Sequence, residues 1–179
     1  MKLQLNREYA TRHLGVALLF TVLCGWFAWD GAIAWPNEIA AWEKENGTKA
    51  SVYLAAHPEY AHSHTKEERG GLPHLPSELD RQFQFAGLCG VAALIIAGLV
   101  LLDYRRTLTW DDEQMCGTLT GGTPLRFDDI AGFDESKWEK KGILTVYAKD
   151  ARKVVLDTWH HTGARELAEK LLAARPATN

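Results

Sequence analysis

The chain has 179 residues, 46% of them hydrophobic, and a formal net charge of −3 at pH 7. Its length would suit one soluble domain, but the apolar residues are concentrated in two blocks, at residues 14–35 and 81–103. The weak net charge lacks the strong basic character of a nucleic-acid-binding protein, so no nucleic-acid partner is expected. The three cysteines form no C-x-x-C pair, so a thiolate metal site or redox pair is not expected either.

The first apolar block follows a short segment, residues 1–13, in which three cationic side chains outnumber one acidic side chain. Cationic flanks remain in the cytoplasm by the positive-inside rule, so the block predicts a transmembrane helix that runs outward. Three tryptophans gather at its outer end, where indole rings favour the headgroup level. These expected membrane-interface anchors are Trp26, Trp29 and Trp35.

A secretory signal peptide is an alternative interpretation of the first block, because residues 32–34 have the small-x-small form of a cleavage site. The tryptophans favour a retained anchor. Asp30 is the one ionisable residue in the block, and a carboxylate in mid-bilayer costs about 2.5 to 3.5 kcal/mol. Since Asp30 lies near the outer end, we expect it at a boundary, with Gly31 loosening the helix and Pro36 starting another.

The second block carries no charge between Phe83 and Leu102. An α-helix of about 20 residues crosses a hydrocarbon core of about 30 Å. The aromatic and basic anchors expected at a cytoplasmic membrane face follow directly: Tyr104, Arg105 and Arg106. Together the blocks predict an α-helical membrane hairpin with both termini in the cytoplasm and residues 36–80 on the extracytoplasmic side.

Small residues recur at helical spacing in both blocks. Such stripes let helix backbones approach closely in lipid, where dispersion and weak polar contacts hold helices together. The two stripes consist of Thr21, Gly25, Ala28 and Ala32, and of Ala86, Gly90, Ala93 and Ala97. They are equally compatible with packing of the two helices on each other and with docking to the helices of other membrane subunits.

The segment between the blocks is acidic and rich in turn formers. We expect short helices at residues 36–46, capped by Gly47, and at residues 50–56, and we expect Ser77 to be the N-cap of the second membrane helix. The segment also holds four candidate metal ligands: His57, His62, His64 and His74. Their spacing is not diagnostic of a metal site, so a solvated polar loop is the preferred interpretation.

After Arg106 the sequence changes to short runs rich in Thr, Val, Ile, Leu and aromatic residues, separated by turn signals. These runs predict an antiparallel meander with strands at residues 107–110, 114–119, 125–127, 130–133, 142–147 and 153–158. We expect Thr162 to cap a final helix that ends at Ala174 and covers the open side of the sheet. Its apolar face comprises Ala164, Leu167, Ala168, Leu171 and Leu172.

The C-terminal region contains, in order, strands, the W-x-x-K-G-I motif (138–143), a hairpin, the V-V-L-D run (154–157) and one closing helix. This order resembles the last part of small bacterial PH-like domains. Those domains occur on membrane proteins beside paired transmembrane helices. The resemblance covers residues 107–175 and implies an α+β domain, assigned here to residues 104–179, in a multi-pass protein of the bacterial inner membrane. The segment is shorter than a seven-stranded PH barrel needs, and its first hairpin lacks the basic cluster that holds phosphoinositide headgroups in relatives. A lipid-headgroup site is therefore not inferred.

Motifs for chemistry are absent from the sequence: it contains no P-loop, no dinucleotide-binding glycine pattern, no G-x-S-x-G and no H-E-x-x-H. The pair His160-His161 is expected in a turn, and Trp138 and Trp159 are core aromatics or partner-docking candidates. We therefore expect no enzymatic activity and no cofactor. The preferred function is a scaffold or accessory subunit that binds other integral membrane subunits. The alternative is a membrane sensor whose histidine-bearing loop binds a metal or ligand.

Overall fold

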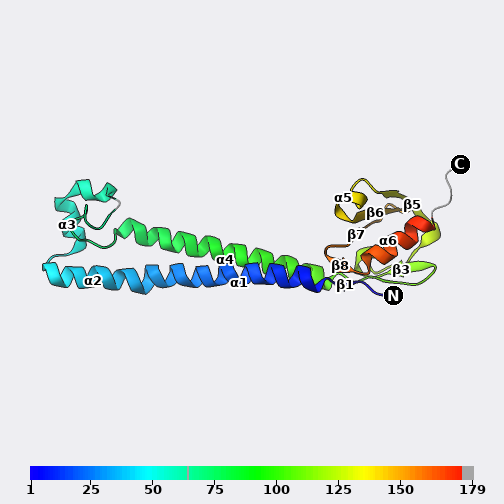
Figure 1. The fold of residues 1–179 in the computed structure, drawn as a ribbon, viewed down its shortest axis with the longest axis horizontal. Helices are drawn as coiled ribbons and strands as arrows, with labels where there is room; N and C mark the ends of the chain where they lie inside the picture. The colour runs from blue at the N-terminus through cyan, green and yellow to red at the C-terminus, as the bar shows by residue number, and fades with distance from the viewer. Residues whose placement is uncertain (64, 175–179) are drawn as a thin grey trace. The chain divides into compact units, whose positions relative to one another are not determined.

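The computed structural model describes residues 1–63 and 65–174 (Figure 1). The chain divides into two compact units, of which one combines Met1–Gly15 with the residues from Ile96 onward and the other comprises Val16–Ile95. The first unit contains the C-terminal domain and the adjoining ends of both long helices. The second contains the remainder of those helices and the segment that connects them.

Two long helical segments are apolar and long enough to cross a membrane, by length and composition. The first consists of α1 (Arg7–Trp29), a π-helical segment η1 (Asp30–Ala34) and α2 (Trp35–Asn46), while the second is α4 (Pro76–Arg105). The sequence predicted that Gly31 loosens the helix and that Pro36 starts another, and the structure has a π-helical segment at Asp30–Ala34 that leads into α2. Pro36 cannot donate a backbone hydrogen bond to the residue four positions earlier, and the wider π turn before it accommodates the proline.

The small-residue stripe of α4 lies at the contact between the helices of the second unit. Ala86 and Ala93 are buried there, and a Cβ added at Gly90 would lie 3.4 Å from the sulfur of Cys24. The stripe of α1 is different, because Thr21 is exposed and the space beside Gly25 is open. One stripe therefore packs against the other helix within the chain, while the other stripe remains largely accessible.

The connecting segment forms a small helical cap with its own core. It contains α3 (Ala50–Ala56) and the 3-10 helix η2 (Pro58–His62), and its buried residues are Trp42, Ala50, Leu72 and Leu75. Gly47 has the left-handed conformation expected of a helix C-cap, with φ of 64°. The prediction for Ser77 was wrong, because α4 begins at Pro76 and it is the carboxylate of Glu78 that accepts the N–H of Leu75 at 2.9 Å.

The C-terminal region contains two small antiparallel sheets in place of one continuous meander. The first sheet has the order β2-β3-β4 and the second the order β5-β6-β7. Their strands are β2 (Thr109–Trp110), β3 (Gln114–Cys116), β4 (Leu125–Arg126), β5 (Ile130–Asp134), β6 (Ile143–Ala148) and β7 (Lys153–Asp157). The 3-10 helices η3 (Thr118–Thr120) and η4 (Phe127–Asp129) and the short helix α5 (Trp138–Lys141) interrupt the run of strands.

A single hydrophobic core joins the sheets to the final helix, α6 (Ala164–Ala173). Alternate residues of β6 and β7 point into it, as a period-two pattern requires. The apolar face of α6 covers this core as expected, with Ala164, Leu167, Ala168 and Leu171 buried and Leu172 half-buried. Thr162 is not the cap, because it belongs to the strand β8 (His161–Thr162) and Gly163 precedes the helix.

The first residues of the chain belong to the same core as the C-terminal domain. Strand β1 (Gln4–Leu5) pairs with β8, and Figure 1 shows the two strands side by side. Lys2 forms a β-bridge with Thr109, and the side chain of Leu3 is only 2% exposed in the core. The sequence had assigned this stretch only to a cytoplasmic leader, although Leu3 and Leu5 alternate with polar residues in the manner of a strand.

Candidate functional site at the helix ends

A buried carboxylate, Asp103, marks the place where both long helices meet the C-terminal domain. Asp103 lies in the last turn of α4 and is 5% exposed. Its Oδ2 accepts a hydrogen bond of 2.9 Å from the hydroxyl of Tyr9, which lies in the first turns of α1. A buried carboxylate requires such partners, because an isolated charge in a medium of low dielectric constant is costly.

Two cationic or titratable side chains complete the surroundings of the carboxylate. Arg106 places Nη1 2.9 Å from Oδ1 of Asp103, and His160 places Nδ1 3.3 Å from Oδ2. The ring of His160 also stacks on Tyr9, with 4.4 Å between centroids. Three segments that are distant in sequence therefore converge on one side chain: the start of α1, the end of α4 and the turn between β7 and β8.

The neighbouring His161 lies on β8 and is 4% exposed, with its Nε2 3.4 Å from the backbone carbonyl oxygen of Asp103. Burial disfavours the charged ring and lowers the pKa of His161 below its usual value. The neutral ring can donate one hydrogen, and because a carbonyl oxygen only accepts, that hydrogen belongs on Nε2. His161 was expected in a turn, but it is a buried strand residue that contacts the end of α4.

We call Tyr9, Asp103, Arg106, His160 and His161 the junction cluster. The buried Asp103 carboxylate accepts a hydrogen bond from the Tyr9 hydroxyl and forms an ion pair with the exposed guanidinium of Arg106. The arrangement can hold the helix ends to the domain. The cluster could not be predicted from sequence patterns, because Tyr9 and Asp103 are 94 positions apart.

The expected membrane-interface anchors occupy different environments. Trp26, Trp29, Tyr104 and Arg105 are exposed. Trp35 instead stacks on His74, with 4.0 Å between the ring centroids. Arg106 is held by Asp103 in the junction cluster, and Asp30 is half-buried in the π-helical segment.

The two candidate docking tryptophans differ in burial. Trp138 is half-buried against the core of the domain, and the guanidinium of Arg165 lies 5.7 Å from its ring centroid. Trp159 is 43% exposed and contacts Tyr9 edge-on. The guanidinium of Arg12 lies 5.5 Å from the centroid of the Trp159 ring. Of the two, Trp159 offers more surface to a partner.

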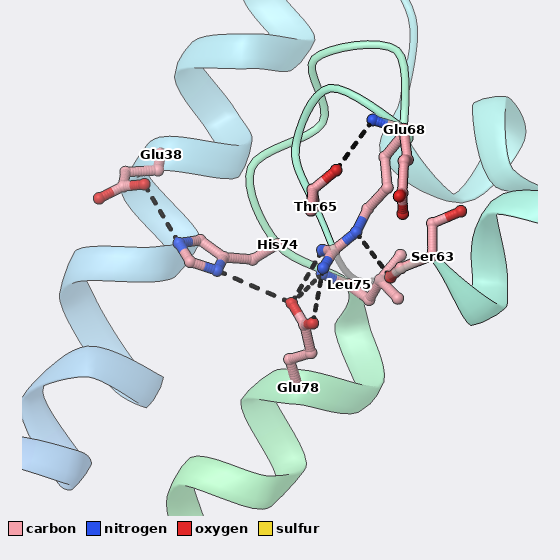
Figure 2. Close-up of polar contacts among 8 residues, drawn as sticks. Glu38, Ser63, Thr65, Glu68, His74, Leu75 and Glu78 are labelled. Carbon is pink, nitrogen blue, oxygen red and sulfur yellow. Dashed lines mark hydrogen bonds and ion pairs between the residues drawn. The ribbon is translucent and has the colours of Figure 1, made fainter.

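The candidate metal ligands of the connecting segment are engaged in local contacts. Figure 2 shows His74 between two carboxylates. Its Nε2 lies 3.2 Å from Oε2 of Glu38, and its Nδ1 lies 3.8 Å from Oε2 of Glu78. The buried guanidinium of Arg69 holds both carboxylate oxygens of Glu78, at 3.0 and 2.9 Å. His57 stacks on Tyr60.

Within residues 1–63 and 65–174, no group of three or more His, Cys, Asp or Glu side chains is placed to hold a metal ion. His64 lies outside the described residues, so the site that includes it stays a prediction. The contacts of His74 favour a structural role in the helical cap, since its ring is already shared between an indole and two carboxylates.

No protein-family model, curated protein or solved structure matches this chain. Function is therefore inferred from the junction cluster, the helix surfaces and the surface of the C-terminal domain.

Proposed function

We propose that the protein is a non-enzymatic integral membrane protein that serves as a scaffold or accessory subunit of a larger membrane complex. In this role the two long helices form a membrane hairpin and hold a PH-like domain at the cytoplasmic face of a bacterial inner membrane. The observation that carries the proposal is the junction cluster, in which Asp103 joins the ends of both helices to the domain. In this proposal the cluster attaches the domain to the cytoplasmic ends of both helices.

The pairing of β1 with β8 supports this topology. Residues in one sheet must lie on the same side of a membrane, so the chain before α1 and the domain after α4 share one compartment. Two crossings satisfy that condition. The cationic side chains Arg7, Arg12 and Arg105 flank the helices at this end, which favours the cytoplasm by the positive-inside rule.

The exposed stripe of α1 supports a role in assembly. Two helices cannot cover each other completely, so most of each helix surface must meet lipid or other helices. Gly25 lies in open space on that stripe, where a neighbouring helix from another subunit could approach closely. The exposed Trp159 beside the junction cluster offers an aromatic anchor for a partner at the membrane surface.

The test is purification from native membranes in a mild detergent through a C-terminal tag, followed by measurement of the mass and composition of the complex. We expect other membrane subunits at a fixed ratio. Recovery of the chain alone, or only of its self-oligomers, would contradict the proposal.

A matched pair of glycine variants localises the contact. Gly25→Leu fills the open stripe of α1 and should reduce partner recovery, while Gly87→Leu fills an exposed glycine position on α4 that also has open space beside it. Both substitutions add the same side chain to an apolar helix, so a general effect on insertion would change both. Equal recovery with both variants at the wild-type level would show that the stripe of α1 is not the docking surface.

A further inference from the structure

A groove of about 640 Å³ lies on the C-terminal domain, apart from the junction cluster. Residues 130–133 of β5 line it, and none of the residues that line it belongs to β6. Among residues 1–63 and 65–174, β5 has a hydrogen-bonded neighbour on only one side, in the order β5-β6-β7, so the groove follows its open edge. It therefore lies where backbone N–H and C=O groups are available to another strand.

The side chains at residues 130–133 do little to protect this edge, although the strand carries a β-bulge, which is one of the usual protective devices. Long charged side chains, prolines or a covering helix commonly block an open strand, whereas residues 130–133 are Ile, Ala, Gly and Phe. The strand has a bulge between Ile130 and Gly132, which leaves Ala131 outside the regular ladder with β6. The edge carries no large charged group that would repel an incoming backbone within those four positions.

The floor and rim of the groove define the chemistry of an occupant. Phe127, Ile130, Phe133 and Leu171 provide apolar surface. Three acidic side chains line the groove, Asp112, Glu113 and Asp128, against one basic side chain, Arg126, which lies 3.8 Å from Asp128. Lys170 pairs with Asp112 at 2.6 Å, and Lys149 donates to the carbonyl oxygen of Asp128 at 2.7 Å. The lining carries a formal charge of about −2, and Asp129, Lys149 and Lys170 beside it bring the local charge to about −1, which favours a cationic partner.

We propose that this groove binds an extended segment of a partner protein as an added β-strand on β5, and that the segment alternates apolar and basic residues. Alternate side chains of a strand point to opposite faces, so one set can enter the apolar floor while the other meets the acidic rim. β5 has five residues, which suits a segment of about five to seven residues. The inference rests on the proposed function, because it names the kind of partner that an accessory subunit would hold.

The experiment measures binding to the full-length protein in detergent micelles by fluorescence anisotropy. The probe is a labelled seven-residue peptide of alternating lysine and valine, compared with a peptide of alternating glutamate and valine. We expect the lysine peptide to bind at least tenfold more tightly. Methylation of alternate backbone nitrogens should weaken binding at least tenfold, because a methylated nitrogen cannot donate to the open edge of β5.

Charge-reversal variants locate the site. Glu113→Lys and Asp128→Lys change exposed residues of the rim and should each weaken binding of the lysine peptide at least threefold. Glu139→Lys and Glu166→Lys change exposed acidic residues that do not line the groove, and should leave binding unchanged. Each variant makes the same change in net charge, so loss of binding in all four would show general electrostatic attraction and overturn the proposal.

Equal binding of the methylated and unmethylated peptides would also overturn it, since strand addition needs the backbone donors. The outcome separates this proposal from the proposed function. Peptide binding without partner subunits in the pull-down would contradict the accessory role and support the groove. If both rim variants still recover partner subunits in the pull-down and the lysine peptide does not bind, the accessory role would be supported and the groove proposal contradicted.

Discussion

Removal of the charge on Asp103 should destabilise the protein strongly. In Asp103→Asn the side chain keeps its shape, but an amide nitrogen that only donates replaces one carboxylate oxygen. The Tyr9 hydroxyl, at 2.9 Å, and His160, at 3.3 Å, both depend on Oδ2, while Arg106 loses its charge partner at Oδ1. A hydrogen bond to a charged group contributes about 1.5 to 3 kcal/mol, and a donor left buried without an acceptor costs about 1 to 3 kcal/mol.

From these values we expect a loss of about 2 to 4 kcal/mol, since Asn retains one acceptor. In a chain of this size about 1 kcal/mol corresponds to about 2 to 4 °C in unfolding temperature, so the shift should be about 4 to 16 °C. Tryptophan fluorescence during heating of the full-length protein in detergent measures it. Asp128→Asn is the matched control, because Asp128 has a side chain that is 90% exposed and should not change the unfolding temperature measurably.

The double variant Tyr9→Phe with Asp103→Asn tests whether the two groups act through one hydrogen bond. Tyr9→Phe alone should cost about 1 kcal/mol, and the double variant should cost less than the sum of the single variants, because the second substitution removes a bond that the first has already broken. Strict additivity would refute direct coupling. A wild-type unfolding temperature for Asp103→Asn would refute the view that the junction cluster holds the helix ends to the domain.

Three further outcomes follow from other contacts. Leu3→Ala should lower stability by about 2 to 4 kcal/mol in thermal unfolding, because Leu3 fills the domain core, and an unchanged value would contradict that packing. The lowered pKa of His161 means that the unfolded chain takes up a proton first, so stability should fall as the pH drops below about 6.5. That fall should be smaller in His161→Gln, in which Asp103, Arg106 and His160 still face the ring position. Arg69→Met should expose the helical cap to limited proteolysis, whereas Arg165→Met, which alters an exposed arginine, should not.

Local sequence patterns were sufficient to predict many of the helices and strands. The lengths of the apolar blocks predicted the two long helices. The period-two runs predicted six strands, and each is present with ends that differ from the prediction by at most three residues. The apolar face of α6 and the left-handed cap at Gly47 were also correct. These features depend on neighbours within a few positions, which is the range over which propensity and periodicity act.

The caps and the junction cluster lay beyond that range. Ser77 and Thr162 are ordinary N-cap residue types, but Pro76 can occupy the first turn of α4, and pairing with β1 commits Thr162 to a strand. Asp103 and Arg106 were interpreted as the end of a membrane segment and its basic flank. Their actual partners, Tyr9 and His160, become visible only when the chain is folded, because no sequence spacing brings them together.

Short connections on both sides of the junction cluster attach the helix ends directly to strands of the domain. Asn6 alone separates β1 from α1, and residues 106–108 separate α4 from β2, with Leu108 fully buried in the core. A flexible tether would allow a domain to move independently of its helices, but neither connection has the length or composition of one. A displacement of either helix end must therefore move a strand that belongs to the domain core.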